Sequence, residues 1–298
     1  MSGEVLSRRD VHCAITDKIV AAVEAGAGDY CMPWHRTVTR PVNGFTGKVY
    51  HGINVLSLWA TAATRGFRSG HWATYRQWRE LGAQVRKGER GAVIVFYKTV
   101  EPMKEDQDDD EEKAGQSRLI ARASWAFNAE QVDGWTAPTP QPRSEVETRK
   151  HVEAFIASTR ADIRHGGDIA CYDPVGDYIA VPHSEQFVAT ETSSATEGYY
   201  SVILHELTHW TGAASRLART LKARFGDEAY AMEELVAEFG AAFLCADLGI
   251  ANEPRLDHAA YVSSWLKVLS KDRTALFTAA NKASVAATYL SDFAAPRA

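Results

Sequence analysis

The chain has 298 residues, of which 45% are hydrophobic and 24% are charged, a composition that excludes low-complexity and fibrous proteins. Its formal net charge is −5, and no apolar run approaches the roughly 20 residues needed to span a bilayer, so we expect no membrane segment. The polar start of the chain is not followed by an apolar signal segment, and its four cysteines form no CxxC pair. We therefore expect reduced thiols and a cytoplasmic protein.

The first half of the chain predicts a mixture of helices and strands. Apolar periodicity favours helices over residues 9–25 and 54–65 and a short helix over 73–81. Two strand-like runs, 91–100 and 121–127, flank an acidic segment at 101–116, which we expect to be the solvated loop joining two paired strands. Three prolines between residues 136 and 144 indicate a linker. We expect one domain over 1–135, a linker over 136–145 and a second domain over 146–298.

The second half of the chain predicts a mainly helical domain. Helices are expected over residues 146–159, 198–211, 230–248, 259–269 and 274–290. Between the first two helices, a turn with Pro and Gly separates two short strands, 168–172 and 177–181. The expected fold class is therefore α+β, with an α/β domain followed by a mainly helical one.

Charge is distributed unevenly between these halves. Positions 34–98 hold eleven Lys or Arg against two acids, whereas the chain from 141 onward holds fifteen against twenty-one. Basic residues interleaved with aromatic ones are typical of single-stranded nucleic-acid binding, since cations follow phosphates and rings stack on bases. The alternative is that the aromatic residues build a core. The predicted DNA-binding residues are Trp34, Arg36, Arg40, Lys48, Tyr50, Trp72, Tyr75, Arg76, Arg86, Lys87 and Arg90.

The segment around residue 205 carries the most specific chemical pattern. His205, Glu206 and His209 form an HExxH motif in a stretch expected to be helical, so both imidazoles lie one turn apart and can bind one Zn²⁺. Glu206 lies nearly on the same face, where its carboxylate can take a proton from water that zinc activates. The motif predicts a one-metal hydrolase of the zincin type. The alternative is an amphipathic helix with two exposed histidines.

A catalytic zinc needs a third protein ligand, and the helix over 230–248 supplies carboxylates. Glu234 and Glu238 stand beside an apolar stripe that includes Leu235 and Phe239, whereas Glu233 is expected to face solvent. We assign Glu234 to the metal and Glu238 to the orientation of a ligand histidine. The reverse assignment stays open, as does a solvated pair of surface glutamates.

Two weaker candidates complete the predicted site. Tyr261, on the helix over 259–269, and His258 beside it can donate to a developing oxyanion, although such residues also serve as packing residues. Residues 177–182 are expected to form the sheet edge on which an extended peptide binds through main-chain hydrogen bonds.

Nearly the whole chain carries a set of short segments in order: PWHR at 33–36, TGKVYHGIN at 46–54, WATYRQW at 72–78, GAQVRKGE at 82–89, FNAEQV at 127–132, HELTHWTG at 205–212 and residues 233–245. As a set they resemble the ArdC family of plasmid-borne antirestriction proteins. The resemblance implies an N-terminal domain that binds single-stranded DNA, also found at the start of some plasmid primases, and a zincin-like metallopeptidase domain. It implies that conjugative plasmids carry such proteins, which help incoming DNA to escape host restriction enzymes. It also implies that His205 and His209 are metal ligands and that Glu206 is the catalytic position.

We therefore expect an antirestriction protein that binds single-stranded DNA and carries a metallopeptidase site. Zn²⁺ is the expected metal, with Mn²⁺ as the alternative. A component of the host restriction system is the expected protein substrate. The competing hypothesis is a non-catalytic DNA-binding protein whose metal only stabilises the fold.

Overall fold

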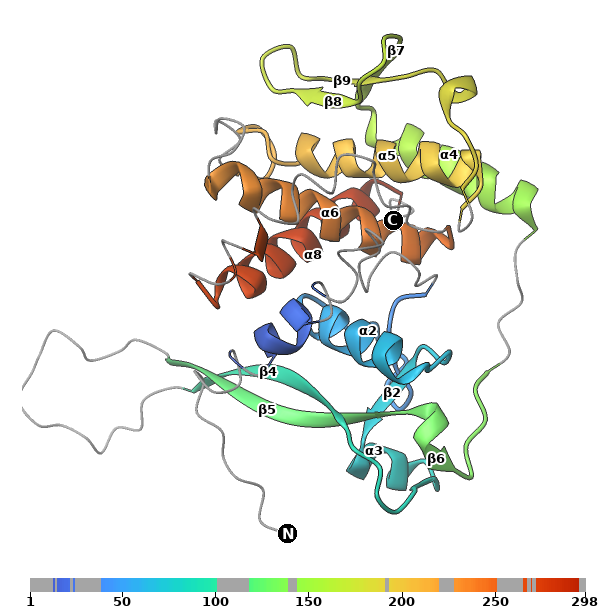
Figure 1. Cartoon of the computed structure of the whole chain (residues 1–298), viewed down its shortest axis with the longest axis vertical. Helices are drawn as coiled ribbons and strands as arrows, with labels where there is room; N and C mark the ends of the chain where they lie inside the picture. Colours follow the sequence, from blue (N-terminus) through green and yellow to red (C-terminus); the bar gives the residue numbers. More distant parts are fainter. Residues whose placement is uncertain are drawn as a thin grey trace, which may run out of the picture.

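The structure is a computed structural model of the whole chain. It describes residues 13, 15–21, 24, 39–100, 118–138, 144–190, 193–219, 228–250, 265–266, 269 and 272–294, with the backbone alone at 97–100 and 118–121. Along its longest axis, a three-stranded sheet lies at one end, a layer of helices in the middle and a four-stranded sheet at the other end (Figure 1). The fold is α+β, as predicted.

The four-stranded sheet has the order β1 (Val42–Asn43), β2 (His71–Thr74), β5 (Arg118–Asn128) and β4 (Ala92–Val100). β4 pairs antiparallel with β5 over the whole length of β4, which confirms the predicted pair of strands. Helix α2 (Ile53–Arg65) packs on β4, where the Asn54 side chain exchanges two hydrogen bonds with the main chain of Val95. On the opposite side of the sheet lie α3 (Tyr75–Glu80) and a two-stranded sheet of β3 (Gln84–Val85) and β6 (Val132–Asp133) (Figure 1). The 3-10 turn η1 (Ala129–Gln131) connects β5 to β6.

The prediction of one helix over residues 73–81 is wrong at its start. β2 runs to Thr74 and pairs with β5, and the helix begins only at Tyr75. Thr74 ends the strand because it caps α3: its hydroxyl accepts from the Gln77 amide, and the Gln77 side chain accepts from the Thr74 amide. The capping box marks the start of the helix, which the apolar periodicity alone does not show.

The other half contains the expected long helices. They are α4 (Glu145–Thr159), α5 (Ala195–Trp210), α6 (Glu228–Leu248) and α8 (Ala275–Ala294), each within a few residues of its predicted range. Of the helix predicted over 259–269, only residues 265–266 and 269 are described, and these are helical. Of the helix predicted over 9–25, residues 13, 15–21 and 24 are described and helical.

The small sheet above α5 has the order β7 (Asp162–His165), β9 (Tyr178–Val181) and β8 (Cys171–Asp173), followed by the 3-10 turn η2 (Ser184–Gln186). The predicted strand at 177–181 is β9, but it lies in the centre of the sheet, parallel to β7 and antiparallel to β8. The prediction that residues 177–182 form a sheet edge is therefore wrong. β7 escaped prediction because a strand with the single apolar residue Ile163 gives no alternating pattern.

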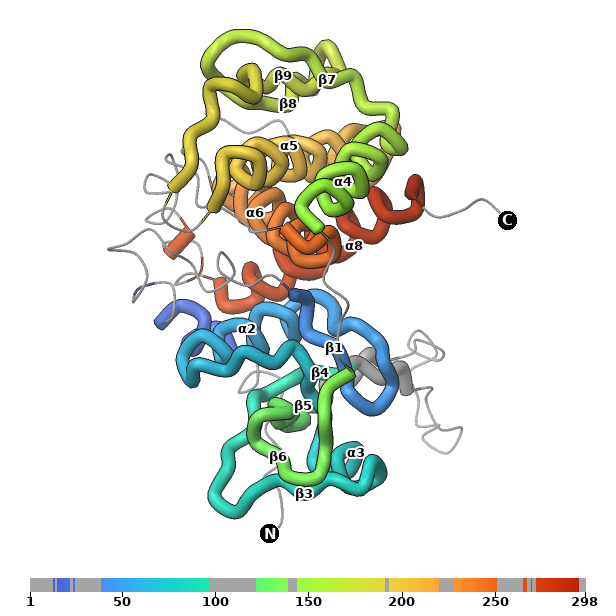
Figure 2. The backbone as a smooth tube through the Cα atoms, turned by 90° about the vertical axis from the view of Figure 1, so that its right-hand side faces the viewer, coloured from blue at the N-terminus to red at the C-terminus, as the bar shows by residue number. Residues whose placement is uncertain are grey.

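The two halves of the chain share one apolar core. It runs from α2 and the four-stranded sheet into α5, α6 and α8, and the tube view shows α2 directly beneath α8 (Figure 2). The Trp59 and Phe243 rings lie 5.8 Å apart across this junction, and the Gly52 amide donates to Ser284 Oγ at 2.7 Å. Each half therefore covers apolar surface that the other half would expose to water.

No helix among the described residues is long and apolar enough to cross a membrane. Among the described residues no disulfide joins Cys13, Cys171 and Cys245, and Cys31 lies outside them. The acidic segment over 101–116 also lies outside them.

Candidate metal centre

Helix α5 carries the HExxH residues in a well-defined helical frame. Ser194 caps its first turn by accepting from the Glu197 amide, and the Glu197 carboxylate accepts from Ser194 in return. The helix then buries His205 and Glu206, each 3% exposed, on sides that face other elements of the fold. Buried ionisable groups are costly unless they are paired, so this burial indicates a polar partner.

That partner comes from α6, which crosses α5 at close range. Gly240 makes the approach possible, because a Cβ at this position would lie 2.5 Å from Thr208 Cγ2 and 2.7 Å from Thr208 Oγ1. Thr208 precedes His209, and Gly240 lies on the same helix as Glu234, so the crossing brings the carboxylate to the histidines. Any larger residue at position 240 would separate the two helices.

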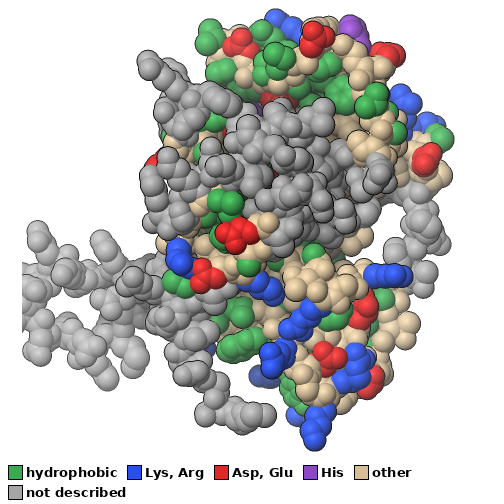
Figure 3. Space-filling model, viewed as in Figure 1, with side chains coloured by type: hydrophobic (Ala, Val, Ile, Leu, Met, Phe, Trp, Pro, Cys, Tyr) green, Lys and Arg blue, Asp and Glu red, His purple; other side chains and the backbone are tan. Residues whose placement is uncertain are grey.

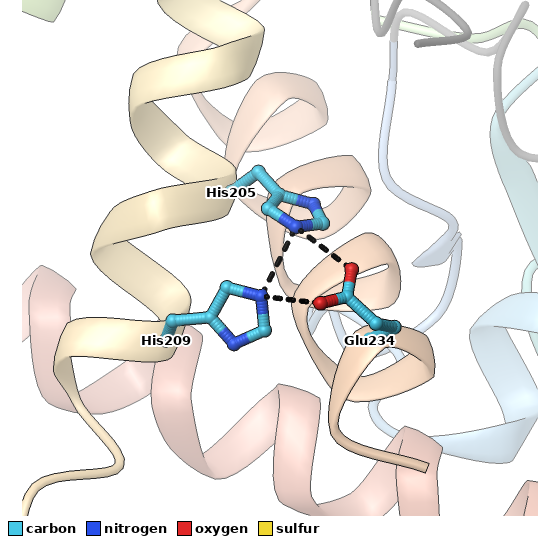
Figure 4. Close-up of side chains that lie close together, drawn as sticks. All are labelled: His205, His209 and Glu234. Atoms are coloured by element: carbon cyan, nitrogen blue, oxygen red, sulfur yellow. Dashed lines mark hydrogen bonds and ion pairs between the residues drawn. The ribbon is translucent and has the colours of Figure 1, made fainter. Parts of the chain in front are cut away.

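The polar atoms of three side chains converge between these helices (Figure 4). Nε2 of His205 lies 3.1 Å from Nε2 of His209. The Glu234 carboxylate faces both rings, with Oε2 3.5 Å from His205 Nε2 and Oε1 3.5 Å from His209 Nε2. Among the described residues, these three form the group of His, Cys, Asp and Glu side chains that can hold a metal ion.

The spacing of these atoms fits a divalent cation. A tetrahedral Zn²⁺ with bonds of about 2.0–2.1 Å holds its ligand atoms about 3.3 Å apart, close to the three separations in this site. Two imidazole nitrogens and a carboxylate are also the donor set of many catalytic zinc sites. Glu206 follows His205 on α5 and is buried, and its charge helps to raise the pKa of His209.

A second carboxylate lies behind each imidazole. Glu238 Oε2 lies 3.9 Å from His205 Nδ1. Glu238 is the residue that was predicted from the sequence to orient a ligand histidine. Glu233 Oε1 lies 3.3 Å from His209 Nδ1. The prediction that Glu233 faces solvent is wrong, because its side chain is only 11% exposed and is held by Arg219. Spacing on an ideal helix could not foresee that the segment after α5 folds back over it.

The charges of this cluster depend on one another. Burial by itself lowers the pKa of His209, but hydrogen bonds with Glu233 and Glu234 outweigh burial and raise that pKa to about 10. Burial raises the pKa of Glu234, yet its contacts with both imidazoles outweigh this effect and hold the pKa well below its ordinary value. The site therefore concentrates negative charge around two imidazoles, which favours a cation between them.

Two solved structures share this fold over nearly the whole chain. Both are of the antirestriction protein ArdC from the R388 plasmid, one metal-free and one with Mn(II) bound. The metal-free one is 40% identical, with a TM-score of 0.77 over 96% of this chain and 98% of that one. The Mn(II)-bound one is 39% identical, with a TM-score of 0.75 over 97% and 100%. The chain belongs to the ArdC antirestriction family.

Two family models and two relatives add detail to this membership. Residues 9–127 match the N-terminal domain of the anti-restriction factor ArdC, and residues 150–282 match a zincin-like metallopeptidase. The protein y4eC of Sinorhizobium fredii (strain NBRC 101917 / NGR234) is 46% identical over 94% of this chain and 91% of its own length. The DNA primase TraC of Escherichia coli is 36% identical over 92% of this chain, which spans only 26% of that primase.

Three of the predicted DNA-binding residues lie in the interior of this ArdC-family fold. Trp72 is 1% exposed and Tyr50 is 6% exposed, so neither ring can stack on a base. Arg40 lies over the Phe243 ring at 4.8 Å, and its Nη1 donates to Asp247 Oδ2 at 2.7 Å. It joins the two halves of the chain and cannot contact a phosphate in this arrangement. These three predictions are wrong, because composition does not distinguish a core aromatic or a buried cation from an exposed one.

The other predicted DNA-binding residues that the structure describes reach the surface. Arg86 is tied to its own subdomain through Glu89 at 3.2 Å and Asp133 at 3.4 Å, and Arg76 pairs with Glu80 at 2.8 Å. Tyr75 is 44% exposed, and Lys48, Lys87 and Arg90 are exposed as well. Their role in DNA binding stays a prediction. Trp34, Arg36, His258 and Tyr261 lie outside the described residues.

The structure adds residues that the sequence did not single out. Phe96 on β4 and Arg122 on β5 lie opposite each other in the sheet register, and both are exposed. Trp125, also on β5, is 40% exposed. The sequence could not show that Phe96 and Arg122 are neighbours, because this depends on the register of the two strands.

Proposed function

We propose that this protein protects incoming plasmid DNA from host restriction during conjugation, by binding the DNA as single strands and by the action of a metallopeptidase site. The observation that carries the proposal is the convergence of His205, His209 and Glu234 beside buried Glu206. Membership of the ArdC family supplies the antirestriction context. The proposed place of action is the cytoplasm, where transferred DNA meets restriction enzymes.

In the proposed site, His205, His209 and Glu234 hold a divalent cation, with Zn²⁺ as the first candidate and Mn²⁺ as the second. Such a cation, when bound, supplies Lewis acidity that activates water for attack on a carbonyl. The Glu206 carboxylate accepts the proton of the attacking water and later returns it to the leaving nitrogen. Tyr261 is proposed to donate to the developing oxyanion, and Glu238 to orient His205. The proposed substrate is a protein of the host restriction system.

The four-stranded sheet is the proposed surface for single-stranded DNA, within a DNA-binding domain over residues 1–135. The paired, exposed side chains of Phe96 and Arg122 combine a ring that can stack on a base with a cation for the adjacent phosphate. Lys and Arg side chains cluster over this end of the molecule, with apolar side chains among them (Figure 3). Trp125 on β5 pairs with Val93, so its exposed ring lies on the other face of the sheet from Phe96 and Arg122 and is not part of this surface. Lys48, Lys87 and Arg90 add positive charge.

Fluorescence-anisotropy titration with a labelled oligonucleotide tests the DNA surface. Phe96→Ala should weaken binding about tenfold, because one stacked base contributes about 1–3 kcal/mol. Arg122→Glu should also weaken binding, because it places an anion beside the phosphates. Val175→Ala, which truncates an exposed apolar side chain on the β8–β9 turn, is the control and should bind like wild type. Unchanged affinity in both sheet variants would exclude this surface.

A conjugation assay with a restricting recipient tests the catalytic part of the proposal. Glu206→Gln keeps the size of the side chain but removes its basicity, so it should abolish protection while metal content and melting temperature stay close to wild type. His205→Ala should lose both metal and protection.

One observation favours a second candidate, a DNA-binding protein whose metal is structural. The candidate ligands lie at the crossing of α5 and α6, inside the core that both halves share, so a metal there would join two helices of the core. In that case Glu206→Gln would protect DNA as well as wild type, whereas chelation would lower the melting temperature sharply.

A further inference from the structure

The segment that follows the HExxH helix returns to it through buried arginine side chains, of which Arg219 is the one that also contacts α6 beside the candidate metal ligands. The Arg219 guanidinium donates from Nη2 to the main-chain oxygen of Thr208 at 2.6 Å and from Nη1 to Thr211 Oγ1 at 2.7 Å. Its side chain is only 5% exposed. Two of its contacts therefore lie on the last turn of α5 and the residue that ends it, on either side of His209.

The same guanidinium holds Glu233 of α6 with a forked contact. Nη2 lies 2.8 Å from Glu233 Oε1, and Nε lies 3.1 Å from Oε2. A planar guanidinium matched to both oxygens of a carboxylate fixes the orientation of that carboxylate, which a lysine could not do in the same way. Arg219 thus connects α5 with α6 next to the candidate metal ligands.

Glu233 in turn contacts the ring of His209. Its Oε1, the atom that accepts from Arg219, lies 3.3 Å from His209 Nδ1, while the opposite ring nitrogen, Nε2, faces Glu234 and His205. A carboxylate at Nδ1 holds the proton of a neutral imidazole on that nitrogen and leaves the lone pair of Nε2 for a cation. His209 is then presented in the tautomer that can bind a metal through Nε2.

Energetics indicate that this arrangement has a role beyond packing. A buried charge pair generally contributes little to stability, because the loss of hydration offsets the attraction between the charges. The pair Arg219–Glu233 is nonetheless almost completely enclosed, with exposures of 5% and 11%, and it lies against a candidate metal ligand. An apolar pair would fill the same space, but it would leave His209 Nδ1 without its acceptor.

We propose that Glu233 and Arg219 are positioning residues of the metal centre: Glu233 fixes the tautomer and orientation of His209, and Arg219 fixes Glu233. Neither residue touches the cation or the substrate. The inference rests on the proposed metal site at His205, His209 and Glu234, and it adds a chain of contacts from the segment after α5 to one specific ligand.

Titration of metal-stripped full-length protein with Co²⁺, followed by its visible absorption, tests this proposal. Glu233→Gln and Arg219→Lys should each weaken Co²⁺ binding about 10- to 100-fold and alter the absorption bands, because outer residues that orient a ligand have effects of this size. Glu145→Gln, an exposed carboxylate in the first turn of α4, is the matched control and should bind Co²⁺ like wild type.

The melting temperature of each metal-free variant separates positioning from folding. A Glu233→Gln protein that melts like wild type but binds Co²⁺ more weakly supports the proposal; one with wild-type affinity and spectrum overturns it. Should Glu233→Gln fail to fold, Arg219→Lys keeps the charge and decides by the same comparison. His205→Ala is the test of the metal site itself: if it binds Co²⁺ like wild type, the proposed site is wrong, and this inference fails with it.

Discussion

The metal centre and the basic surface of the N-terminal half both consist of charged and aromatic residues, but they differ in how tightly their surroundings constrain them. At the metal centre, two helices in contact fix the positions of buried polar atoms to within a few tenths of an ångström of what a cation needs. On the basic surface, residues of the same chemical type are divided between the core, surface ion pairs and open solvent. Residue spacing along a helix therefore predicts the members of a site better than amino-acid composition does.

The largest effect is expected from the removal of a candidate metal ligand. We expect His205→Ala to weaken binding of Zn²⁺ or Mn²⁺ by more than the roughly 100-fold typical of residues that only orient a ligand, because two donors cannot hold the ion alone. Isothermal titration calorimetry measures this. His183→Ala removes an exposed histidine of the same domain and should leave the affinity unchanged; equal losses in the two variants would contradict the site.

Two arginines of the basic half, one buried and one exposed, should differ in their contribution to stability. Arg40→Ala should cost about 1.5–3 kcal/mol of unfolding free energy, because it removes a charged hydrogen bond to Asp247 and a buried contact with the Phe243 ring at the junction of the two halves. Arg76→Ala breaks an exposed pair with Glu80 and should cost less than about 0.5 kcal/mol. Urea denaturation followed by circular dichroism measures both. A loss of DNA affinity in Arg40→Ala without any loss of stability would argue that Arg40 is exposed in solution.

Gly240 tests whether helix contact fixes the metal centre. We expect Gly240→Ala to cost about 1–3 kcal/mol, because its Cβ would overlap the Thr208 side chain and push α6 away from α5. The double variant with Thr208→Ala removes the overlapping atoms and should cost less than the sum of the two single changes. A double-mutant cycle in urea measures this coupling. Strict additivity would mean that the helices do not meet at this point.

The smallest effect concerns acid stability at the sheet above α5. Hydrogen bonds from Arg216 lower the pKa of Asp177 below its ordinary value of 3.8. Since the folded-state pKa is depressed, the contact stabilises the fold above about pH 4 and is lost as the pH falls through the folded-state value. Asp177→Asn should therefore cost about 0.2–1 kcal/mol at pH 7 and progressively less below pH 4. Asparagine suits this test because Asp177 has a φ of 52°, a conformation that asparagine tolerates. Thermal melts at pH 7 and pH 3 measure the difference, and an equal loss at both values would contradict the assignment.

Features that depend on local periodicity could be predicted from the amino-acid sequence. The long helices, the β4–β5 pair and the position of the HExxH residues on a helix follow from spacing along a helix or strand, which has a fixed geometry. Spacing left the choice between Glu234 and Glu238 as the third ligand open. Local signals also contained the start of α3, since the capping residues Thr74 and Gln77 are visible in the sequence.

Which residues of one chemical type are buried and which are exposed became clear from the tertiary fold alone. Glu233 turned inward because Arg219 folds back over α5, and Arg40 and Trp72 were buried because α2 and the four-stranded sheet pack against α6 and α8. The central position of β9 likewise depended on β7, a strand with almost no apolar residues of its own. These outcomes arise from contacts between segments far apart in the chain, whose free energies are not encoded in any local pattern.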